Sequence, residues 1–266
     1  MKLALLKLSG KSLNEFLTNP KWFLLIVELQ KKYDGLVIVH GAGKDISDWS
    51  EKLGFKSEFI DGQRITTPEI MNVVSAVQSG MTNGKIVSHL LSKGFDAIGL
   101  TGSDRNLFLA VPENIKLGLV GIPKINQSST WILELINQKV IPVFSSVCRN
   151  EEGHLMNVNA DIFSNSLAIE LKADSVFFNS DIDGVIINKE VKHQMTESNI
   201  NESIQSGQVY GGMIPKLNSA VELVKKGIGQ VWIGSSNPDD LLDLLTEKQH
   251  KGTLIIPEIN PEGVIA

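Results

Sequence analysis

Short runs of apolar residues alternate along this chain with longer segments whose apolar residues recur at helical spacing. Several runs are continuous rather than alternating in polarity, which is typical of strands buried on both faces of a sheet. Strands that alternate with helices favour a mainly parallel sheet with helices on both faces, an α/β fold. The runs expected to form strands are Lys2–Leu8, Gly35–His40, Ala97–Leu100, Val140–Phe144, Ser175–Asn179, Gly184–Ile187 and Gln230–Gly234.

Three segments between these runs are predicted to be helices. They cover residues 67–93, 159–172 and 215–226. Thr66 or Thr67 can cap the first helix, and Glu69 is placed for a capping box. Pro215 near the start of the last helix and Gly227 just past its end follow the expected asymmetry of helix termini.

Two polar segments with turn residues, near 55–66 and 102–127, interrupt the alternation. We predict hairpins or loops there, at the rim of the sheet. In α/β proteins ligands bind beyond the carboxyl ends of the strands, so such loops are candidates for a site. No internal repeat or low-complexity linker is visible, and a soft boundary between two lobes is expected near Ala173-Asp174.

The chain has 266 residues, enough for one large α/β domain or two closely joined lobes. Its net charge of −5 argues against nucleic-acid or anionic-membrane binding, which needs a basic surface. The single cysteine, Cys148, excludes an internal disulfide and is expected to be a small buried side chain. Lys7 interrupts the first apolar stretch, so no signal peptide is expected, and no run has the roughly 18 apolar residues of a membrane span. We expect a cytoplasmic protein.

Glycine-containing turns follow the first two predicted strands. Gly10-Lys11-Ser12 imitates the end of a Walker A loop, but the position five residues before Gly10 is Leu5 rather than the required glycine. We therefore reject a P-loop NTPase. A turn before a helix can still direct N–H groups toward an anion, although a plain connection with a solvated Lys7 is the simpler local interpretation. Gly41-Ala42-Gly43 can admit a ligand close to the backbone or form an ordinary tight turn, and His40 before it is expected in the core.

Polar residues also gather in later segments. Arg64 could be a surface charge or a bidentate clamp on a substrate carboxylate. Asn157, Asn159 and Asp161 alternate ahead of a helix, and they are more polar residues than one cap needs. Lys216 at a helix start opposes the macrodipole, which is better explained if an anion binds there, although a solvated lysine stays open.

Taken in order, these segments resemble the acetylglutamate kinases of the amino-acid-kinase family. The likeness covers nearly the whole chain, and the loop at Asp181 also looks like the family's. The motifs are Lys-Leu-Ser-Gly at 7–10, His-Gly-Ala-Gly at 40–43, Gly-Gln-Arg-Ile-Thr at 62–66, Gly-Met-Thr-Asn-Gly-Lys-Ile-Val at 80–87, Gly-Leu-Thr-Gly-Ser-Asp at 99–104, Asn-Val-Asn-Ala-Asp at 157–161 and Gly-Gly-Met-Ile-Pro-Lys at 211–216. The resemblance implies a three-layer αβα sandwich with two lobes: residues 1–173 for acyl-amino-acid binding and dimerisation, and residues 174–266 for ATP binding.

The resemblance also implies a reaction, the phosphorylation by ATP of the side-chain carboxylate of N-acetyl-L-glutamate, in arginine biosynthesis. Lys7 and Lys216 would stabilise the transferring phosphoryl group, and Asp161 would orient them. The residues expected to contact the substrate are Ala42, Gly43, Arg64 and Asn157. Those expected to contact phosphate and nucleotide are Gly10, Asp181, Ile182, Asp183, Gly184, Val185, Ile186, Gln208, Val209 and Tyr210. No protein ligand for the metal is expected, because the ATP phosphates would hold Mg²⁺.

Departures from the family's usual residues leave the acyl group open. Ala42 lies within a usual Gly-Gly-Gly, and Lys44 is unusual and could pair with a succinyl carboxylate. N-succinylglutamate and N-acetyl-2-aminoadipate are therefore alternative substrates. A non-catalytic ligand-sensing module is a second alternative, against which Lys7, Asp161 and Lys216 argue.

The chain begins almost directly at its first predicted strand. From the resemblance we expect no N-terminal helix of the kind that links dimers into the arginine-inhibited hexamers of the family. We expect a homodimer with weak or absent feedback by arginine.

Overall fold

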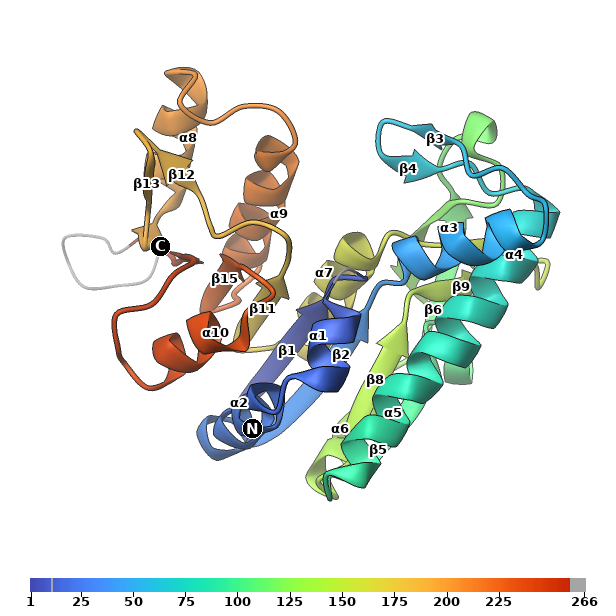
Figure 1. Cartoon of the computed structure of the whole chain (residues 1–266), viewed down its shortest axis with the longest axis horizontal. Coiled ribbons are helices and arrows are strands. Elements are labelled where there is room, and N and C mark those ends of the chain that lie inside the picture. The colour runs from blue at the N-terminus through green and yellow to red at the C-terminus, as the bar shows by residue number, and fades with distance from the viewer. Residues whose placement is uncertain (11, 259–266) are drawn as a thin grey trace.

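The central sheet organises the molecule (Figure 1). The structure is a computed structural model that describes residues 1–10 and 12–258. Within them, eight strands form this sheet in the order β14-β16-β15-β11-β1-β2-β8-β5, and all neighbours are parallel except β15 and β16. Their bounds are β14 Gln194–Met195, β16 Thr253–Ile255, β15 Gln230–Gly234, β11 Ser175–Asn179, β1 Leu3–Leu8, β2 Gly35–His40, β8 Ile141–Ser145 and β5 Ala97–Thr101. The prediction of a mainly parallel sheet is confirmed.

Helices cover both faces of the sheet. Their bounds are α1 Leu13–Thr18, α2 Lys21–Lys32, α3 Gly43–Lys52, α4 Pro68–Val74, α5 Asn83–Ser92, α6 Thr130–Asn137, α7 Ala160–Leu171, α8 Glu197–Gln205, α9 Met213–Lys225 and α10 Pro238–Leu245. The side chains of β1 alternate between two cores. Leu3 and Leu5 pack with α6, α7 and α9, whereas Leu6 and Leu8 pack with α1, α2, α5 and α10. Because each face of one strand supplies a separate core, the molecule is the predicted αβα sandwich.

One predicted strand is confirmed only in part. Of the run Gly184–Ile187, only Ile186–Ile187 is a strand, β12, and it pairs with β13 (Glu190–Val191) in a small hairpin outside the central sheet. Gly184 has a φ of +130°, which interrupts an extended strand. Asn188 and Lys189 both have positive φ, so the chain reverses immediately after Ile187.

The predicted helix over 67–93 is continuous but changes its winding. A π-helical segment, η1 (Ser75–Thr82), joins α4 to α5. Thr67 caps the helix by accepting a hydrogen bond from the Ile70 N–H at 3.3 Å. Glu69 instead accepts from the Thr67 hydroxyl at 2.7 Å, so the predicted capping box does not form.

The last predicted helix is also displaced at its start. The helix α9 begins at Met213, so Pro215 is its third residue rather than its first. Gly227 just past its end has a φ of +93°, as expected for a C-terminal glycine.

Both polar segments form hairpins at the rim, as predicted. The strands β3 (Phe59–Ile60) and β4 (Gln63–Arg64) pair with each other. Four more strands form a separate small sheet in the order β10-β9-β6-β7, with bounds β10 Leu155–Asn157, β9 Val147–Arg149, β6 Phe108–Pro112 and β7 Gly121–Ile125. Short 3₁₀ turns, η2 (Asp104–Asn106) and η3 (Ile115–Leu117), lie in the same segment.

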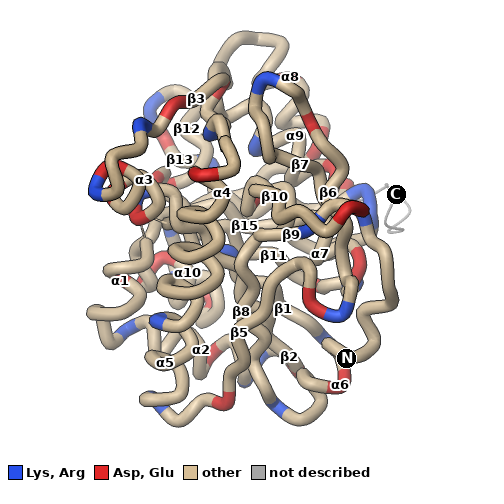
Figure 2. The backbone as a smooth tube through the Cα atoms, turned by 90° about the vertical axis from the view of Figure 1, so that its right-hand side faces the viewer, with Lys and Arg blue, Asp and Glu red and all other residues tan. Residues whose placement is uncertain are grey.

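Charged residues of both signs are interspersed along the backbone (Figure 2). Among the described residues, such mixing leaves no broad basic face for a polyanion. Cys148 is buried in the core, as predicted. Within the part of the chain that the structure describes, no helix is long and apolar enough to cross a bilayer.

Candidate active site

Three turns meet at one edge of the central sheet. The strands β2, β1 and β11 are parallel neighbours, so their carboxyl ends lie together. Gly10 lies in the turn after β1, and a Cβ at that position would stand 2.9 Å from the Gly43 nitrogen in the turn after β2. The two turns therefore pack backbone against backbone, which requires glycine at position 10. Lys11 lies outside the described residues.

Lys7 and Asp161 form an ion pair at this edge. The Lys7 ammonium lies 2.5 Å from Asp161 Oδ1, and the lysine is buried at the end of β1. Asn159 caps the helix α7 by accepting hydrogen bonds from the N–H groups of Asp161 at 2.8 Å and Ile162 at 3.4 Å. Burial alone would raise the pKa of Asp161, but Lys7, with a smaller contribution from Lys216, lowers it below its usual value. Asp161 is therefore a carboxylate at neutral pH.

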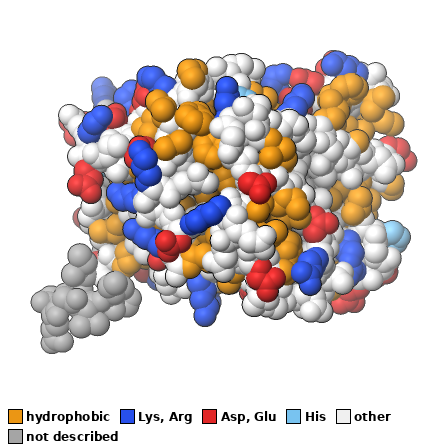
Figure 3. All heavy atoms as spheres, turned by 90° about the horizontal axis from the view of Figure 1, so that it is seen from below, with side chains coloured by type: hydrophobic (Ala, Val, Ile, Leu, Met, Phe, Trp, Pro, Cys, Tyr) orange, Lys and Arg blue, Asp and Glu red, His pale blue; other side chains and the backbone are white. Residues whose placement is uncertain are grey.

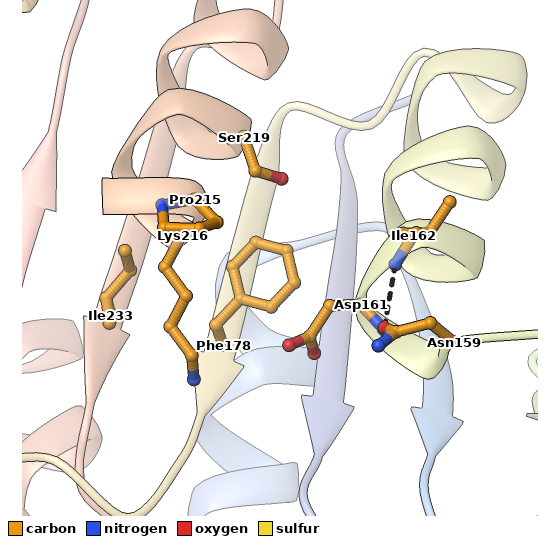
Figure 4. A pocket seen from close by; sticks show the side chains of 8 residues that line it. All are labelled: Asn159, Asp161, Ile162, Phe178, Pro215, Lys216, Ser219 and Ile233. Carbon is orange, nitrogen blue, oxygen red and sulfur yellow. Dashed lines mark hydrogen bonds between the residues drawn. The ribbon is translucent and has the colours of Figure 1, made fainter. Parts of the chain in front are cut away.

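Lys216 faces the same space from the opposite wall. Figure 4 shows its side chain extending from the first turn of α9 toward the level of the Asp161 carboxylate, which comes from α7. The cleft between them, of about 200 Å³, is the central cleft, and it is also lined by Phe178 and Ser219. Ser219 accepts a hydrogen bond from the Asn165 amide, which joins α9 to α7. Lys216 and Asp161 thus line one cleft, and Lys7 lies beside it as the ion-pair partner of Asp161.

A second cavity, the upstream pocket of about 170 Å³, adjoins the central cleft through Asn159, which lines both. Its lining comes from residues 41–160 and includes the four predicted substrate residues Ala42, Gly43, Arg64 and Asn157. The Asn157 amide donates to Thr66 Oγ1 at 3.1 Å, which fixes its position in the wall.

Arg64 is held rigidly in this pocket without an acidic partner. Its guanidinium donates to the Gly43 carbonyl at 2.9 Å, to Ser47 Oγ at 2.8 Å and to Ser57 Oγ at 2.6 Å, and it stacks on Phe59. Burial lowers the pKa of Arg64, but a guanidinium remains charged. No carboxylate of the described residues lies within ion-pair distance of it, so its charge is available to an anionic ligand.

A third cavity, the downstream cleft of about 500 Å³, contains the predicted nucleotide residues. The residues that line it are Asp181, Ile182, Asp183, Gly184, Val185, Ile186, Gln208, Val209, Tyr210 and Met213. Ile186 and Tyr210 are 54% and 79% exposed, so apolar surface is open to a ligand. Met213 begins the same helix that carries Lys216, which connects this cleft to the central one.

Lys44 does not face the upstream pocket. Its side chain is exposed and pairs with Asp48 one helical turn later, at 2.5 Å. This contact raises the pKa of Lys44. The suggested pairing of Lys44 with a succinyl group in the pocket is therefore not supported.

Sequence reasoning missed Gln78 and Ser146, which line the upstream pocket. Gln78 lies four residues after Val74, on the apolar face of a predicted helix, so a polar residue in an apolar stripe was the available signal. Ser146 had no comparable signal. In the part of the chain that the structure describes, no three His, Cys, Asp or Glu side chains cluster to hold a metal ion.

The amino acid kinase family model matches residues 2–235. The chain belongs to the amino acid kinase family. An acetylglutamate kinase of Campylobacter fetus is 40% identical over 228 residues, covering 84% of this chain and 81% of that protein. An acetylglutamate kinase of Staphylococcus saprophyticus is 33% identical over 257 residues, covering 96% of this chain and 100% of that protein. These relatives confirm the resemblance that the ordered motifs indicated.

Solved structures agree on the fold of this family member. A crystal structure of smu.665 from Streptococcus mutans UA159 superposes with a TM-score of 0.75, at 27% identity, over 96% of this chain and 98% of that one. The amino-acid-kinase fold that the sequence predicted is thereby confirmed.

Proposed function

We propose that the chain catalyses the ATP-dependent phosphorylation of the side-chain carboxylate of N-acetyl-L-glutamate to an acyl phosphate, a step of arginine biosynthesis. The observation that carries the proposal is the central cleft, where Lys216 and Asp161, which is paired with Lys7, lie between an upstream pocket and a downstream cleft. The names of the relatives identify the acid. A buried arginine without an acidic partner, Arg64, suits an acid with a second carboxylate.

The proposed roles follow the three cavities. Ala42, Gly43, Arg64 and Asn157 hold the acid in the upstream pocket. ATP lies in the downstream cleft, where the exposed apolar surface of Ile186 and Tyr210 suits a flat base. The γ-phosphate reaches the central cleft, with Gly10 at its turn. Mg²⁺ is held mainly by the phosphates of ATP, whose charge it neutralises.

The chemistry requires no general base. The side-chain carboxylate of the acid is already ionised at neutral pH and is itself the nucleophile. The difficulty is to bring two anions together in line, so catalysis consists of positioning and charge stabilisation. Lys216 supplies positive charge from the wall of the central cleft, and Lys7 supplies it from beside Asp161, which holds the Lys7 ammonium at 2.5 Å.

The division of labour between lobes supports the same proposal. The residues that line the upstream pocket lie between positions 41 and 160, and those of the downstream cleft between 181 and 213. We propose that residues 1–173 bind the acid and form a homodimer, and that residues 174–266 bind ATP. The predicted cytoplasmic location remains part of this proposal.

A hydroxamate assay tests the reaction and its substrate. The purified protein is incubated with Mg-ATP and N-acetylglutamate, N-succinylglutamate or N-acetyl-2-aminoadipate, and hydroxylamine traps any acyl phosphate. We expect hydroxamate from N-acetylglutamate, because Lys44 is turned away from the pocket. Product only from one of the other acids would change the substrate, and no turnover with any of them would favour a ligand sensor.

A further inference from the structure

Gln78 is a buried polar side chain in the wall of the upstream pocket. It is 3% exposed and lies in the π-helical segment η1. Its Nε2 donates hydrogen bonds to the His40 carbonyl at 3.3 Å and to Ser146 Oγ at 2.9 Å. A carbonyl oxygen can only accept, so this contact decides which end of the carboxamide is nitrogen.

The remaining polar atom of Gln78 is an acceptor. Both hydrogens of Nε2 have partners, and no hydrogen bond from a described residue reaches Oε1. The neighbouring Ser146 donates its hydroxyl hydrogen to the Val158 carbonyl at 2.6 Å, so it has no hydrogen left for a ligand. The side chains in this part of the wall therefore offer acceptors to whatever occupies the pocket.

An N-acylated acidic amino acid has one group that matches such a wall. At neutral pH its two carboxylates and its acyl carbonyl only accept hydrogen bonds, whereas its amide N–H is the single donor. A buried acceptor that meets no donor destabilises the complex. On the basis of the proposed function, we infer that Gln78 Oε1 accepts the amide N–H of the substrate. Gln78 thereby selects acids with an N-acyl group over those with an oxygen at that position.

The location of Gln78 on its helix supports this role. Val74 and Val77 on the same helix are buried in an apolar cluster with Ile46 and Met71. A glutamine beside this cluster loses hydration that its two donated bonds only partly replace. π-Helical segments occur often at functional sites, where the extra residue in a turn redirects a side chain.

A substrate analogue tests the inference directly. In 2-acetoxyglutarate an ester oxygen replaces the amide N–H of N-acetylglutamate while the two carboxylates remain. ADP formation gives kcat/KM for both compounds with the wild-type protein and with Gln78→Met, a variant of similar volume. We expect the wild type to prefer the amide by about tenfold or more, because the ester leaves Oε1 facing another acceptor. Gln78→Met is expected to remove most of this preference, by slowing the amide more than the ester.

Ser146→Ala is the matched control, because it removes a partner of Nε2 but keeps Oε1 in the wall. Whatever its effect on rate, it should preserve the preference for the amide. A wild-type protein that uses both compounds equally would overturn the inference without any variant. So would a folded Gln78→Met that keeps the full preference, since Asn157 or Gln63 in the same pocket would then accept the N–H. A wild-type protein inactive with N-acetylglutamate would instead contradict the proposed function.

Discussion

At the scale of single residues, the site combines one neutralised charge with two that lack an acidic partner. Lys7 is paired with Asp161, whereas neither Lys216 nor Arg64 lies within 4.0 Å of a carboxylate of the described residues. Both line cavities. Positive charge in a cleft attracts anions, so these two side chains explain how one site can hold two negatively charged substrates.

Replacing Lys216 should affect the chemical step. We expect Lys216→Ala to lower kcat by about 10²–10³-fold, with a much smaller change in KM for ATP, because the charge acts on the transferring phosphoryl group. Steady-state kinetics of hydroxamate formation measure both constants. Lys226→Ala, which removes an exposed lysine from the far end of the same helix, should leave them unchanged. An unaltered kcat in Lys216→Ala would refute the assigned role.

His40 should make the stability of the fold sensitive to mild acid. Complete burial lowers its pKa from 6.5 to about 4, so the folded protein keeps the imidazole neutral where the unfolded chain protonates it. The wild type should therefore lose about 2–3 kcal/mol of unfolding free energy as pH falls from 6.5 to 4.5. His40→Gln should lack this part of the loss, whatever its stability at pH 7. Urea unfolding at both pH values measures the free energy of unfolding of each protein. The same decrease between pH 6.5 and 4.5 in the wild type and in His40→Gln would contradict the prediction.

At the scale of elements, tight contacts between turns and hairpins position the site. The segment that carries Arg64 continues to Thr66, which exchanges backbone hydrogen bonds with Leu117 and Leu119. Gly118 between them has a φ of +69°, and a Cβ there would stand 2.5 Å from the Thr66 carbonyl oxygen. Glycine at this position lets the rim hairpin hold the wall of the upstream pocket.

Gly118→Ala should therefore destabilise the fold more than an alanine at an ordinary positive-φ turn. Gly153 is the matched control, because its φ is +88° but nothing lies within 4 Å of its would-be Cβ. Alanine is strained at both positive-φ positions, but Gly118 also has a ψ of −126°, outside the left-handed region, so Gly118→Ala adds a further backbone penalty and a clash with a rigid backbone oxygen. Urea denaturation measures the free energy of unfolding of the two variants. Equal decreases would show that the backbone at Thr66 moves to accommodate the added methyl group. We also expect a higher KM for the acid only in Gly118→Ala.

At the scale of the whole molecule, one sheet runs through both of the proposed lobes. The strand β11, which follows the expected boundary near Ala173-Asp174, pairs directly with β1. The proposed lobes thus share a sheet, while the upstream pocket and the downstream cleft are lined by separate parts of the chain. This continuity brings Asp161, the ion-pair partner of Lys7 in the proposed first lobe, into the same cleft as Lys216 of the proposed second lobe.

The proposed homodimer should form at the free edge of this sheet. The strand β5 is the last in the sheet. Three apolar side chains on or near it are partly open to solvent: Ile98 and Met81 are each 38% exposed, and Leu91 is 50% exposed. Figure 3, which shows one face of the molecule, has hydrophobic side chains in several groups among charged ones. An open edge with apolar neighbours is a site for pairing with a second copy.

Light scattering during size-exclusion chromatography measures the mass in solution. We expect twice the 29.1 kDa of the chain for the wild type and a shift toward one copy for Leu91→Asp, because a buried charge opposes association. Leu24→Asp, at a residue 52% exposed on α2, should remain a dimer. A monomeric wild type, or two variants with the same mass, would exclude this edge as the interface.

The sequence by itself determined most of the central sheet and predicted residues that line the observed cavities. β2, β11 and β15 lie at the predicted positions, because a strand buried on both faces must be continuously apolar. The short strands β14 and β16 at the far edge were not predicted, since two or three residues carry no periodic signal. The residues predicted to contact the acid and the nucleotide line two separate cavities, because the ordered motifs marked the turns that end the central strands.

Only the tertiary structure decided which way individual side chains face. Lys44 directly follows the turn Gly41-Ala42-Gly43 in sequence. Its side chain nevertheless pairs with Asp48, one turn further along α3, and does not line the upstream pocket. Gln78 is distant in sequence from every motif residue it contacts, and only the packing of η1 against the end of β2 brings it to the wall. Local sequence sets the elements, but a pocket forms between elements, so its lining depends on how they pack.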